Sequence, residues 1–288
     1  MWGTIFLVPL LLPDYPALAL SAGRYLAFGI VVLVPAWIGR RQLLRLGRAD
    51  WFRALELSLI GNLLYYLGIA VAVQRAGAPM TTMIIGTLPV VIAVIGNLKD
   101  RHIAWNRLAL PLLVIGAGLA LVHGEEWERA GGDTSEHYLL GIAAAIGALV
   151  CWTWYPLRNA AWIRARPDLS MADWATAQGL TTAPLALAVF IGLAAVPGYS
   201  WPFGSQGVVF IGLMLVLGVC ASWLGTIFWN QTSRLLPSGL SGQMIVFETV
   251  FGMAYTFAYR GEWPSVGTLA GLGLLVSGVV LGVRAVRS

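Results

Sequence analysis

The stretch RLLPSGLSGQMIVFETVF (residues 234–251) aligns without a gap with QRAGAPMTTMIIGTLPVV (residues 74–91), at a shift of 160 residues. In this alignment Ile245 falls on Ile85. Identities elsewhere are few, but hydropathy and loop positions agree through the two halves. The pattern predicts that the chain is built from two related halves.

The chain is far more apolar than a soluble protein. Its 288 residues are 58% hydrophobic and 11% charged, whereas soluble domains carry about 25% charged residues. Between Asp173 and Arg234 there is no charged residue at all. Only lipid or other apolar helices can surround such a stretch, so the composition predicts a polytopic membrane protein. The formal net charge of +5 therefore does not indicate nucleic-acid binding.

Ten apolar segments are predicted to be membrane helices, which need about 20 residues each. They lie near residues 1–12, 16–38, 52–73, 79–98, 105–123, 138–158, 171–196, 207–230, 238–259 and 264–284. The first is short, because a dozen residues at about 1.5 Å each reach roughly 18 Å across a core of about 30 Å. We therefore expect about ten further residues before Met1.

Each half contains five spans, so the second half must enter the membrane from the opposite side. We divide the chain into a first repeat (1–123), an acidic outer loop (124–137) and a second repeat (138–288). Cytoplasmic loops are rich in Arg and Lys, and both termini are predicted to be cytoplasmic. The matching loop after span 7 has no arginine, whereas the loop after span 2 has five: Arg40, Arg41, Arg45, Arg48 and Arg53. Homologous loops of reversed charge predict inverted topology, which favours a transporter.

Five short motifs carry a resemblance to a known family. They are WGTIF (2–6), ALALSAGRYLAFG (17–29), TLPV (87–90), FETV (247–250) and GEWPS (261–265). With them the chain resembles the drug/metabolite transporter superfamily, specifically its ten-helix EamA-type members. The resemblance implies an all-α fold of two five-helix inverted repeats in a bacterial inner membrane. It also implies export of metabolites, including amino acids, whereas some members of the family import or exchange other solutes.

Glu248 lies in the middle of span 9, where a carboxylate is costly. The second repeat keeps Glu248 of the family's Glu-Pro pair but has Thr249, while the first has Leu88 and keeps Pro89. Residues at helical spacing from Glu248 form a polar and small stripe that we expect to face the interior: Ser241, Met244, Phe251, Gly252 and Tyr255. Glu248 either binds a substrate amine or a proton, or it locks helices together as a neutral or hydrogen-bonded carboxyl.

Arg24 lies eight residues into span 2, about 12 Å below the outer end of the helix. At this depth its guanidinium either binds a substrate carboxylate, snorkels to the surface, or anchors the fold through a hydrogen bond.

Spans 3 and 8 carry matching polar stripes at i, i+4 and i+8. The stripes and the two residues that flank them are Asn62, Tyr66, Ala70 and Tyr65 in the first repeat, and Ser222, Thr226, Asn230 and Trp229 in the second. Because polar groups facing lipid are costly, the stripes indicate either a shared wet surface or polar contacts that hold helices together.

Aromatic side chains are candidates for the wall of a pocket. Five of the thirteen tryptophans lie deep in spans: Trp2, Trp152, Trp154, Trp223 and Trp229. Several of them, with Tyr155, predict a pocket for an apolar or aromatic body. Lipid-facing packing is the alternative for any one of them.

Other classes of function have weaker support in the sequence. GLSG (239–242) matches the G-x-S-G of rhomboid proteases, but that chemistry needs a histidine on a later helix. The three histidines, His102, His123 and His137, all precede Ser241 and lack metal-ligand spacing. The sequence has no P-loop. A non-transporting scaffold or sensor remains an alternative.

The predicted function is therefore transport by alternating access, with no enzyme activity, metal or cofactor. An amino acid with an apolar or aromatic side chain fits best, with its carboxylate near Arg24 and its amine near Glu248 or near hydroxyl groups. A nucleoside or a cationic compound is the alternative solute. Four glycines of span 10 predict close packing within the fold, or a homodimer through span 5 or span 10: Gly267, Gly271, Gly278 and Gly282.

Overall fold

The structure is a computed structural model that describes residues 1–100, 105–129, 135–196, 206–236, 241 and 245–287. Every regular element in these ranges is helical, which confirms the predicted all-α class. The elements before residue 130 are η1 (Trp2–Ile5), α1 (Val8–Leu11), α2 (Ala17–Val31), α3 (Leu33–Ile38), α4 (Arg40–Leu43), α5 (Arg48–Leu57), η2 (Ser58–Leu64), α6 (Tyr65–Ala76), α7 (Ala78–Ile85), α8 (Leu88–Asp100) and α9 (Trp105–Arg129). Those after residue 135 are α10 (Glu136–Ala165), α11 (Met171–Ala194), α12 (Gly207–Val216), η3 (Leu217–Leu224), α13 (Gly225–Leu235), α15 (Val246–Arg260) and α16 (Val266–Arg287).

Several of these elements join into helices long and apolar enough to cross a membrane. Within the described residues there are six such helices: Ala17–Ile38, Arg48–Ala76, Glu136–Ala165, Met171–Ala194, Gly207–Leu235 and Val266–Arg284. Two shorter apolar helices cover Trp2–Leu11 and Ala78–Ile92. Within the described residues the predicted spans fall on helical segments, and residues 238–240 and 242–244 of the predicted span 238–259 lie outside the described part of the chain.

Side-chain caps and glycines define several helix ends. Ser135 and Ser170 cap α10 and α11, since each hydroxyl accepts a hydrogen bond from the amide three residues later. Gly77 has a φ of +86°, which favours glycine and allows the tight turn between α6 and α7. The helix of span 4 is broken at Gly86 and Thr87, directly before Leu88 and Pro89.

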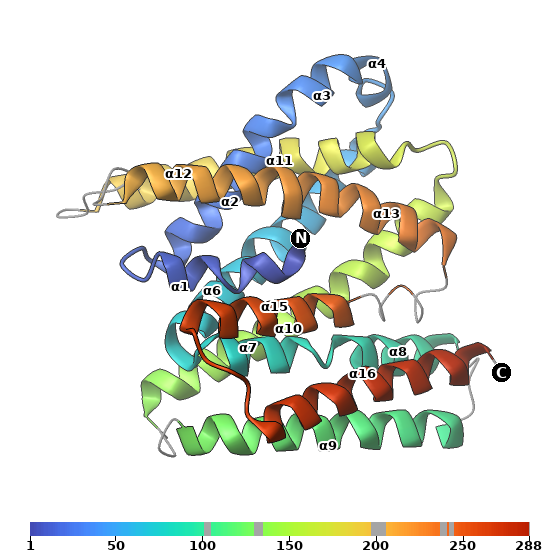
Figure 1. Cartoon of the computed structure of the whole chain (residues 1–288). Helices are drawn as coiled ribbons and strands as arrows, with labels where there is room; N and C mark the ends of the chain where they lie inside the picture. The colour runs from blue at the N-terminus through green and yellow to red at the C-terminus, as the bar shows by residue number, and fades with distance from the viewer. Residues whose placement is uncertain (101–104, 130–134, 197–205, 237–240, 242–244, 288) are drawn as a thin grey trace.

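The helices form one bundle in which segments from the two halves lie against each other. α2 packs against α11, and α6 packs against α10. η1 lies against η3 and α15, near the middle of the bundle (Figure 1). α9 and α16 run side by side along one edge (Figure 1).

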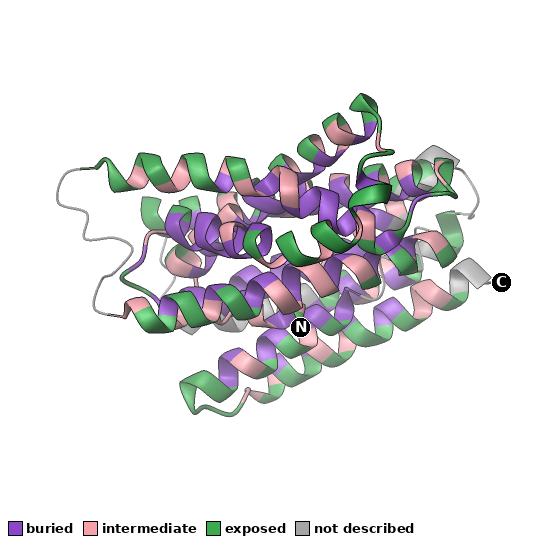
Figure 2. Cartoon of the chain, turned by 90° about the horizontal axis from the view of Figure 1, so that it is seen from above, coloured by how far each residue is buried: buried purple, intermediate pink, exposed green. Residues whose placement is uncertain are grey.

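The core lies between the helices that meet in the centre of the bundle. Figure 2 shows buried residues concentrated in the middle and exposed residues along the outer faces. Large side chains fill the core. Among them are Trp174, Tyr25, Tyr66 and Tyr155, each at most 2% exposed. Many large apolar side chains on the outer faces are exposed, as expected of a bundle surrounded by lipid.

Two of the four predicted glycines of span 10, Gly271 and Gly278, lie at a close contact within the chain. A Cβ placed on Gly118 of α9 would lie 2.8 Å from the carbonyl oxygen of Gly271 in α16. A Cβ on Gly278 would lie 2.5 Å from Ile115 of α9. Small residues therefore let α9 and α16 approach closely, which agrees with the prediction of a packing seam inside the fold.

Candidate functional site

Two π-helical turns interrupt long helices at matching positions of the two halves. η2 and η3 lie in spans 3 and 8, at about the shift of the sequence repeat. Turns of this kind are rare and are frequent at functional sites. Side chains bond to their carbonyl oxygens: the Ser21 hydroxyl donates to the Leu63 oxygen at 2.9 Å, and Nε1 of Trp2 donates to the Ala221 oxygen at 2.8 Å.

Arg24 reaches from α2 into the space between these turns. Its side chain is only 4% exposed, so it points into the bundle and does not snorkel. Nε donates to the Ser222 hydroxyl at 3.0 Å. The guanidinium carbon lies 4.5 Å from the centre of the Tyr66 ring and 5.0 Å from that of Tyr25, both distances typical of cation–π contacts. Nη1 is buried and has no hydrogen-bond partner in the described part of the chain.

Glu248 lies in the first turn of α15 and is 5% exposed. Its Oε1 accepts a hydrogen bond of 3.3 Å from the Tyr65 hydroxyl. Its Oε2 is buried and has no partner among the described residues. A buried carboxyl oxygen without a partner costs free energy, so a hydrogen-bond donor that reached this atom would stabilise it.

Arg24 and Glu248 line the same internal cavity. It has a volume of about 20 Å³ and is bounded by Trp2, Ile5, Arg24, Tyr25, Asn62, Tyr65, Trp152, Ala221, Ser222, Thr226 and Glu248. The two charged side chains make no ion pair with each other within 4.0 Å in the described part of the structure. The cavity has room for one water molecule, and the two side chains each carry one buried polar atom without a partner among the described residues, Nη1 of Arg24 and Oε2 of Glu248.

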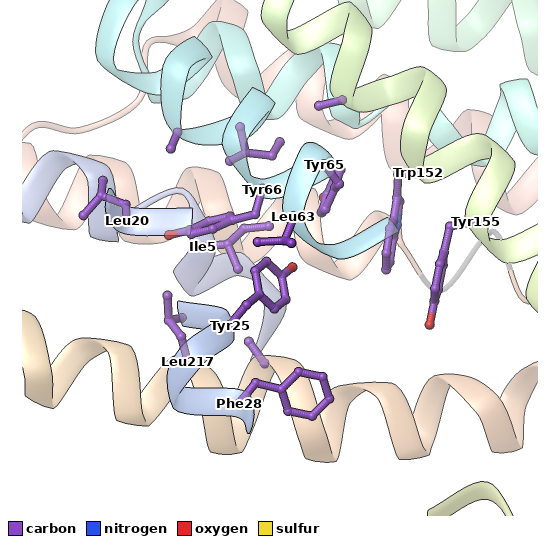
Figure 3. Packing of buried hydrophobic residues seen from close by; sticks show 14 of the residues in the cluster. Ile5, Leu20, Tyr25, Phe28, Leu63, Tyr65, Tyr66, Trp152, Tyr155 and Leu217 are labelled. Carbon is purple, nitrogen blue, oxygen red and sulfur yellow. The ribbon is translucent and has the colours of Figure 1, made fainter. Parts of the chain in front are cut away.

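An aromatic column lies beside this cavity. Trp152 stacks on Tyr65 with ring centres 4.6 Å apart and on Tyr155 with centres 4.9 Å apart, so both faces of its indole are covered (Figure 3). The Tyr155 hydroxyl donates to Oε1 of Gln178 at 2.9 Å. The column therefore connects Glu248 on α15, through Tyr65 of α6 and Trp152 of α10, to α11.

A larger groove adjoins the inner cavity. Its volume is about 250 Å³, and its lining residues are Met1, Trp2, Gly3, Gly225, Phe228, Trp229, Thr232, Phe247, Glu248 and Phe251. The side chains of Phe228, Phe247 and Phe251 are exposed, so the groove opens at the surface of the bundle between α13 and α15.

The remaining predicted site residues separate into those near the cavity and those away from it. Asn62 lines the cavity and donates to Thr182 at 3.1 Å. Asn230 lines neither cavity and accepts a hydrogen bond of 2.8 Å from Asn159, as expected of a residue that holds helices together. Thr226 lines the inner cavity, and Trp229 lines the groove.

Two residues of the predicted Glu248 stripe lie apart from the site, and a third lies outside the described residues. The Ser241 hydroxyl donates to the Thr232 carbonyl oxygen at 3.3 Å. Tyr255 is half-buried, stacks against Phe251 with centres 6.1 Å apart, and lines neither cavity. Met244 is the residue outside the described part of the chain.

Sequence reasoning did not place Tyr25 or Ala221 in the site. Tyr25 directly follows Arg24 in the sequence, so its position beside a predicted site residue could have been used to predict it. Ala221 lines the inner cavity, and its carbonyl oxygen accepts the hydrogen bond from Trp2, which an alanine in the sequence does not indicate. Trp2 was predicted only as a deep tryptophan, and the structure places it at the border of both cavities.

Charged residues at one end of the bundle connect the two halves. Arg166, which follows α10, pairs with Asp50 of α5 and with Asp168. Arg158 of α10 lies 3.7 Å from Glu56 of α5. The hydrogen bonds that Arg166 donates to Asp50, and those that it donates to Asp168, raise the pKa of Arg166. The bonds to Asp168 also hold the pKa of that carboxyl below its usual value.

The described part of the chain is all-helical, has several helices long and apolar enough to cross a membrane, and encloses a cavity lined by an arginine and a glutamate, which is an arrangement typical of membrane transport proteins. Comparison with known proteins gives the family. The EamA-like transporter family matches residues 1–123. Inner membrane protein YtfF of Escherichia coli (strain K12) is 48% identical over 295 residues, which cover 99% of this chain and 92% of YtfF. The chain belongs to the EamA-like transporter family and is an integral protein of the inner membrane.

The fold also matches a solved structure of low sequence similarity. A protein crystal structure with 17% sequence identity superposes with a TM-score of 0.71, over 100% of this chain and 95% of that one. At this identity the match supports the fold alone.

Proposed function

We propose that this transporter exports amino acids with apolar or aromatic side chains by alternating access. One observation carries the proposal. Nη1 of Arg24 and Oε2 of Glu248 both lack a partner among the described residues, and both side chains line one cavity. A cationic donor and an anionic acceptor held apart in one cavity complement a zwitterion, whose carboxylate binds Arg24 and whose ammonium group binds Glu248.

The two charges are held apart by the protein. Arg24 is fixed by Ser222 and by the faces of Tyr25 and Tyr66, and Glu248 is fixed by Tyr65. These contacts fix the position of each of the two side chains in this structure.

The rings around the cavity support an apolar or aromatic side chain on the solute. Tyr65 and Trp152 line the inner cavity, and Trp229 lines the groove. Rings of this kind bury large apolar area and form edge or face contacts with another ring. Export rather than import follows the family resemblance.

The architecture that we propose is ten membrane helices in two five-helix repeats of inverted topology. Mirrored contacts support it: α10 packs against η2 and α7, as η1 packs against η3 and α15. The matching π-turns η2 and η3 support it as well. With both termini cytoplasmic, the ion pairs of α5 with α10 and Arg166 lie at the cytoplasmic end.

A solute of amino-acid size does not fit the inner cavity as it stands. The cavity measures about 20 Å³, whereas sites for small molecules commonly measure about 300–1,000 Å³. The structure is therefore a closed form, and binding requires the halves to separate. The links of Asp50 to Arg166 and of Glu56 to Arg158 are contacts that such a movement breaks at one end.

A cationic compound is the second candidate solute. Glu248 lines both the groove and the inner cavity, and aromatic rings accompany it in each. An organic cation binds well between a carboxylate and aromatic faces. Such a solute would use Glu248 and would have no use for Arg24.

Competition in proteoliposomes distinguishes these solutes. The purified protein is reconstituted, and uptake of labelled amino acids is measured against an internal pool of the same amino acid. Unlabelled phenylalanine, leucine, a nucleoside and a quaternary ammonium compound are added as competitors. We expect phenylalanine and leucine to compete. Competition by the nucleoside or the ammonium compound alone would contradict the proposal.

A further inference from the structure

The groove and the inner cavity meet at two residues. Of the side chains that line either space, only Trp2 and Glu248 line both. Arg24, Asn62 and Thr226 line the inner cavity alone, and Thr232 lines the groove alone. Anything that passes from the groove to Arg24 must therefore pass Trp2 and Glu248.

η3 provides a seat for the indole of Trp2. Nε1 donates to the carbonyl oxygen of Ala221 at 2.8 Å. A Cβ on Gly225 would lie 2.4 Å from the same nitrogen, so only glycine leaves room for the indole there. The ring also meets Trp152 edge-on at 5.6 Å and lies 5.5 Å from Trp229.

Trp2 is more easily displaced than Glu248. Within the described part of the chain, the Trp2 side chain makes one hydrogen bond, to the carbonyl oxygen of Ala221. The residue is half-buried. It belongs to η1, a four-residue 3₁₀ turn, whose hydrogen-bond geometry is poorer than that of an α-helix. Glu248 is 5% exposed, lies in the first turn of the 15-residue helix α15 and accepts a hydrogen bond from Tyr65.

We propose that Trp2 is a gate between the groove and the charged inner cavity. Rotation of its indole away from Ala221 joins the two spaces, and its return separates them. The proposal rests on the proposed function, since it places the inner cavity on the transport route. Trp2 thereby selects solutes that can replace its ring contacts with Trp152 and Trp229.

Cysteine labelling tests the gate without any transported solute. The two native cysteines are replaced (Cys151→Ala and Cys220→Ala), and one cysteine is introduced either in the inner cavity (Thr226→Cys) or in the groove (Thr232→Cys). The proteoliposomes are treated with the water-soluble thiol reagent 2-aminoethyl methanethiosulfonate. With Trp2 present, we expect T226C to react at least tenfold more slowly than T232C.

Opening the gate should then expose the inner position selectively. In the Trp2→Ala background, we expect the T226C rate to rise about tenfold and the T232C rate to stay the same. Trp2→Phe keeps a ring but loses the hydrogen bond to Ala221, so an intermediate rate is expected. Trp223→Ala is the matched control, because Trp223 is also half-buried with one hydrogen bond, to Thr176, and lines neither cavity.

A second variant keeps the test decisive if Trp2→Ala does not fold. Gly225→Ala places a methyl group against Nε1 of Trp2 and should displace the indole, so T226C should again react faster. Two outcomes would overturn the proposal. One is an equal labelling rate of T226C with and without Trp2, and the other is an equal labelling rate of T226C and T232C when Trp2 is present. Because no solute is involved, these outcomes are independent of the amino-acid assignment.

Discussion

The hydroxyl of Tyr65 donates a hydrogen bond of 3.3 Å to Glu248, a residue 183 positions later in the chain. This contact connects α6 of the first half with α15 of the second. The ring of the same tyrosine stacks on Trp152 of α10. One side chain thus orients the carboxylate of the cavity and also takes part in the aromatic column between the halves.

Glu248→Gln should weaken binding of any solute that carries an amine. Glutamine has the same shape and still accepts the hydrogen bond from Tyr65, but it has no charge for the ammonium group. A hydrogen bond to a charged partner contributes about 1.5–3 kcal/mol, or about ten- to hundredfold in affinity. The apparent affinity for phenylalanine, measured by competition in proteoliposomes, should fall by this factor. An unchanged affinity would remove Glu248 from the amine site.

Arg24→Gln should weaken binding of solutes with a carboxylate by a similar factor. Arg24→Lys keeps the charge but loses the planar fork that bonds Ser222 and a carboxylate together, so it should not restore affinity fully. Ser222→Ala is the control for positioning, and it should cost less than Arg24→Gln because the guanidinium remains. The measurement is the apparent affinity for phenylalanine of Arg24→Gln, Arg24→Lys and Ser222→Ala, determined by competition in proteoliposomes. Equal affinities for Arg24→Gln and the unaltered protein would contradict a role of Arg24 in binding the carboxylate.

The main effect of Trp152→Ala should be a lower stability of the fold and not a change in selectivity, because Tyr65 and Tyr155 cover both faces of Trp152. Replacing a buried tryptophan by alanine costs about 3–5 kcal/mol. Val150→Ala is the control on the same helix, since Val150 is 62% exposed. The midpoint of thermal unfolding in detergent should fall clearly for Trp152→Ala and little for Val150→Ala. The same small change in both variants would mean that the column does not support the fold.

Gly118→Ala should loosen the contact between α9 and α16. The new methyl group would lie 2.8 Å from the carbonyl oxygen of Gly271, and a backbone atom cannot move aside as a side chain can. Overpacking of this kind costs about 1–3 kcal/mol. Gly116→Ala on the same helix meets no atom within 4 Å and should be neutral or slightly stabilising. Thermal unfolding compares the two, and equal midpoints would show that the seam tolerates separation.

The sequence was sufficient for features that depend on local pattern. Apolar length predicted the helical segments, and depth in a span predicted that Glu248 and Arg24 carry special roles; the structure places both inside the bundle. It could not predict features that depend on long-range packing. The covered faces of Trp152, the bond between Asn159 and Asn230, and the position of Tyr255 away from both cavities all involve distant segments or the exact rotation of a helix.

The π-turns are a second feature that the sequence did not predict. Residues Ser58–Leu64 and Leu217–Leu224 have ordinary helical composition, and a widened turn arises from the contacts around it. The seat of Trp2 depends on one such turn, through the carbonyl oxygen of Ala221. Such a site becomes visible only when the backbone is known.

The most direct test of the account is competition by three solutes that share one ring and differ in charge. Phenylalanine carries both charges, phenylethylamine lacks the carboxylate, and 3-phenylpropionate lacks the amine. For the unaltered protein in proteoliposomes, we predict that phenylalanine competes best and that each analogue is about tenfold weaker or more. Arg24→Gln should abolish the advantage of phenylalanine over phenylethylamine, and Glu248→Gln its advantage over 3-phenylpropionate. Equal competition by all three solutes, in the unaltered protein and in both variants, would contradict a zwitterion site between Arg24 and Glu248.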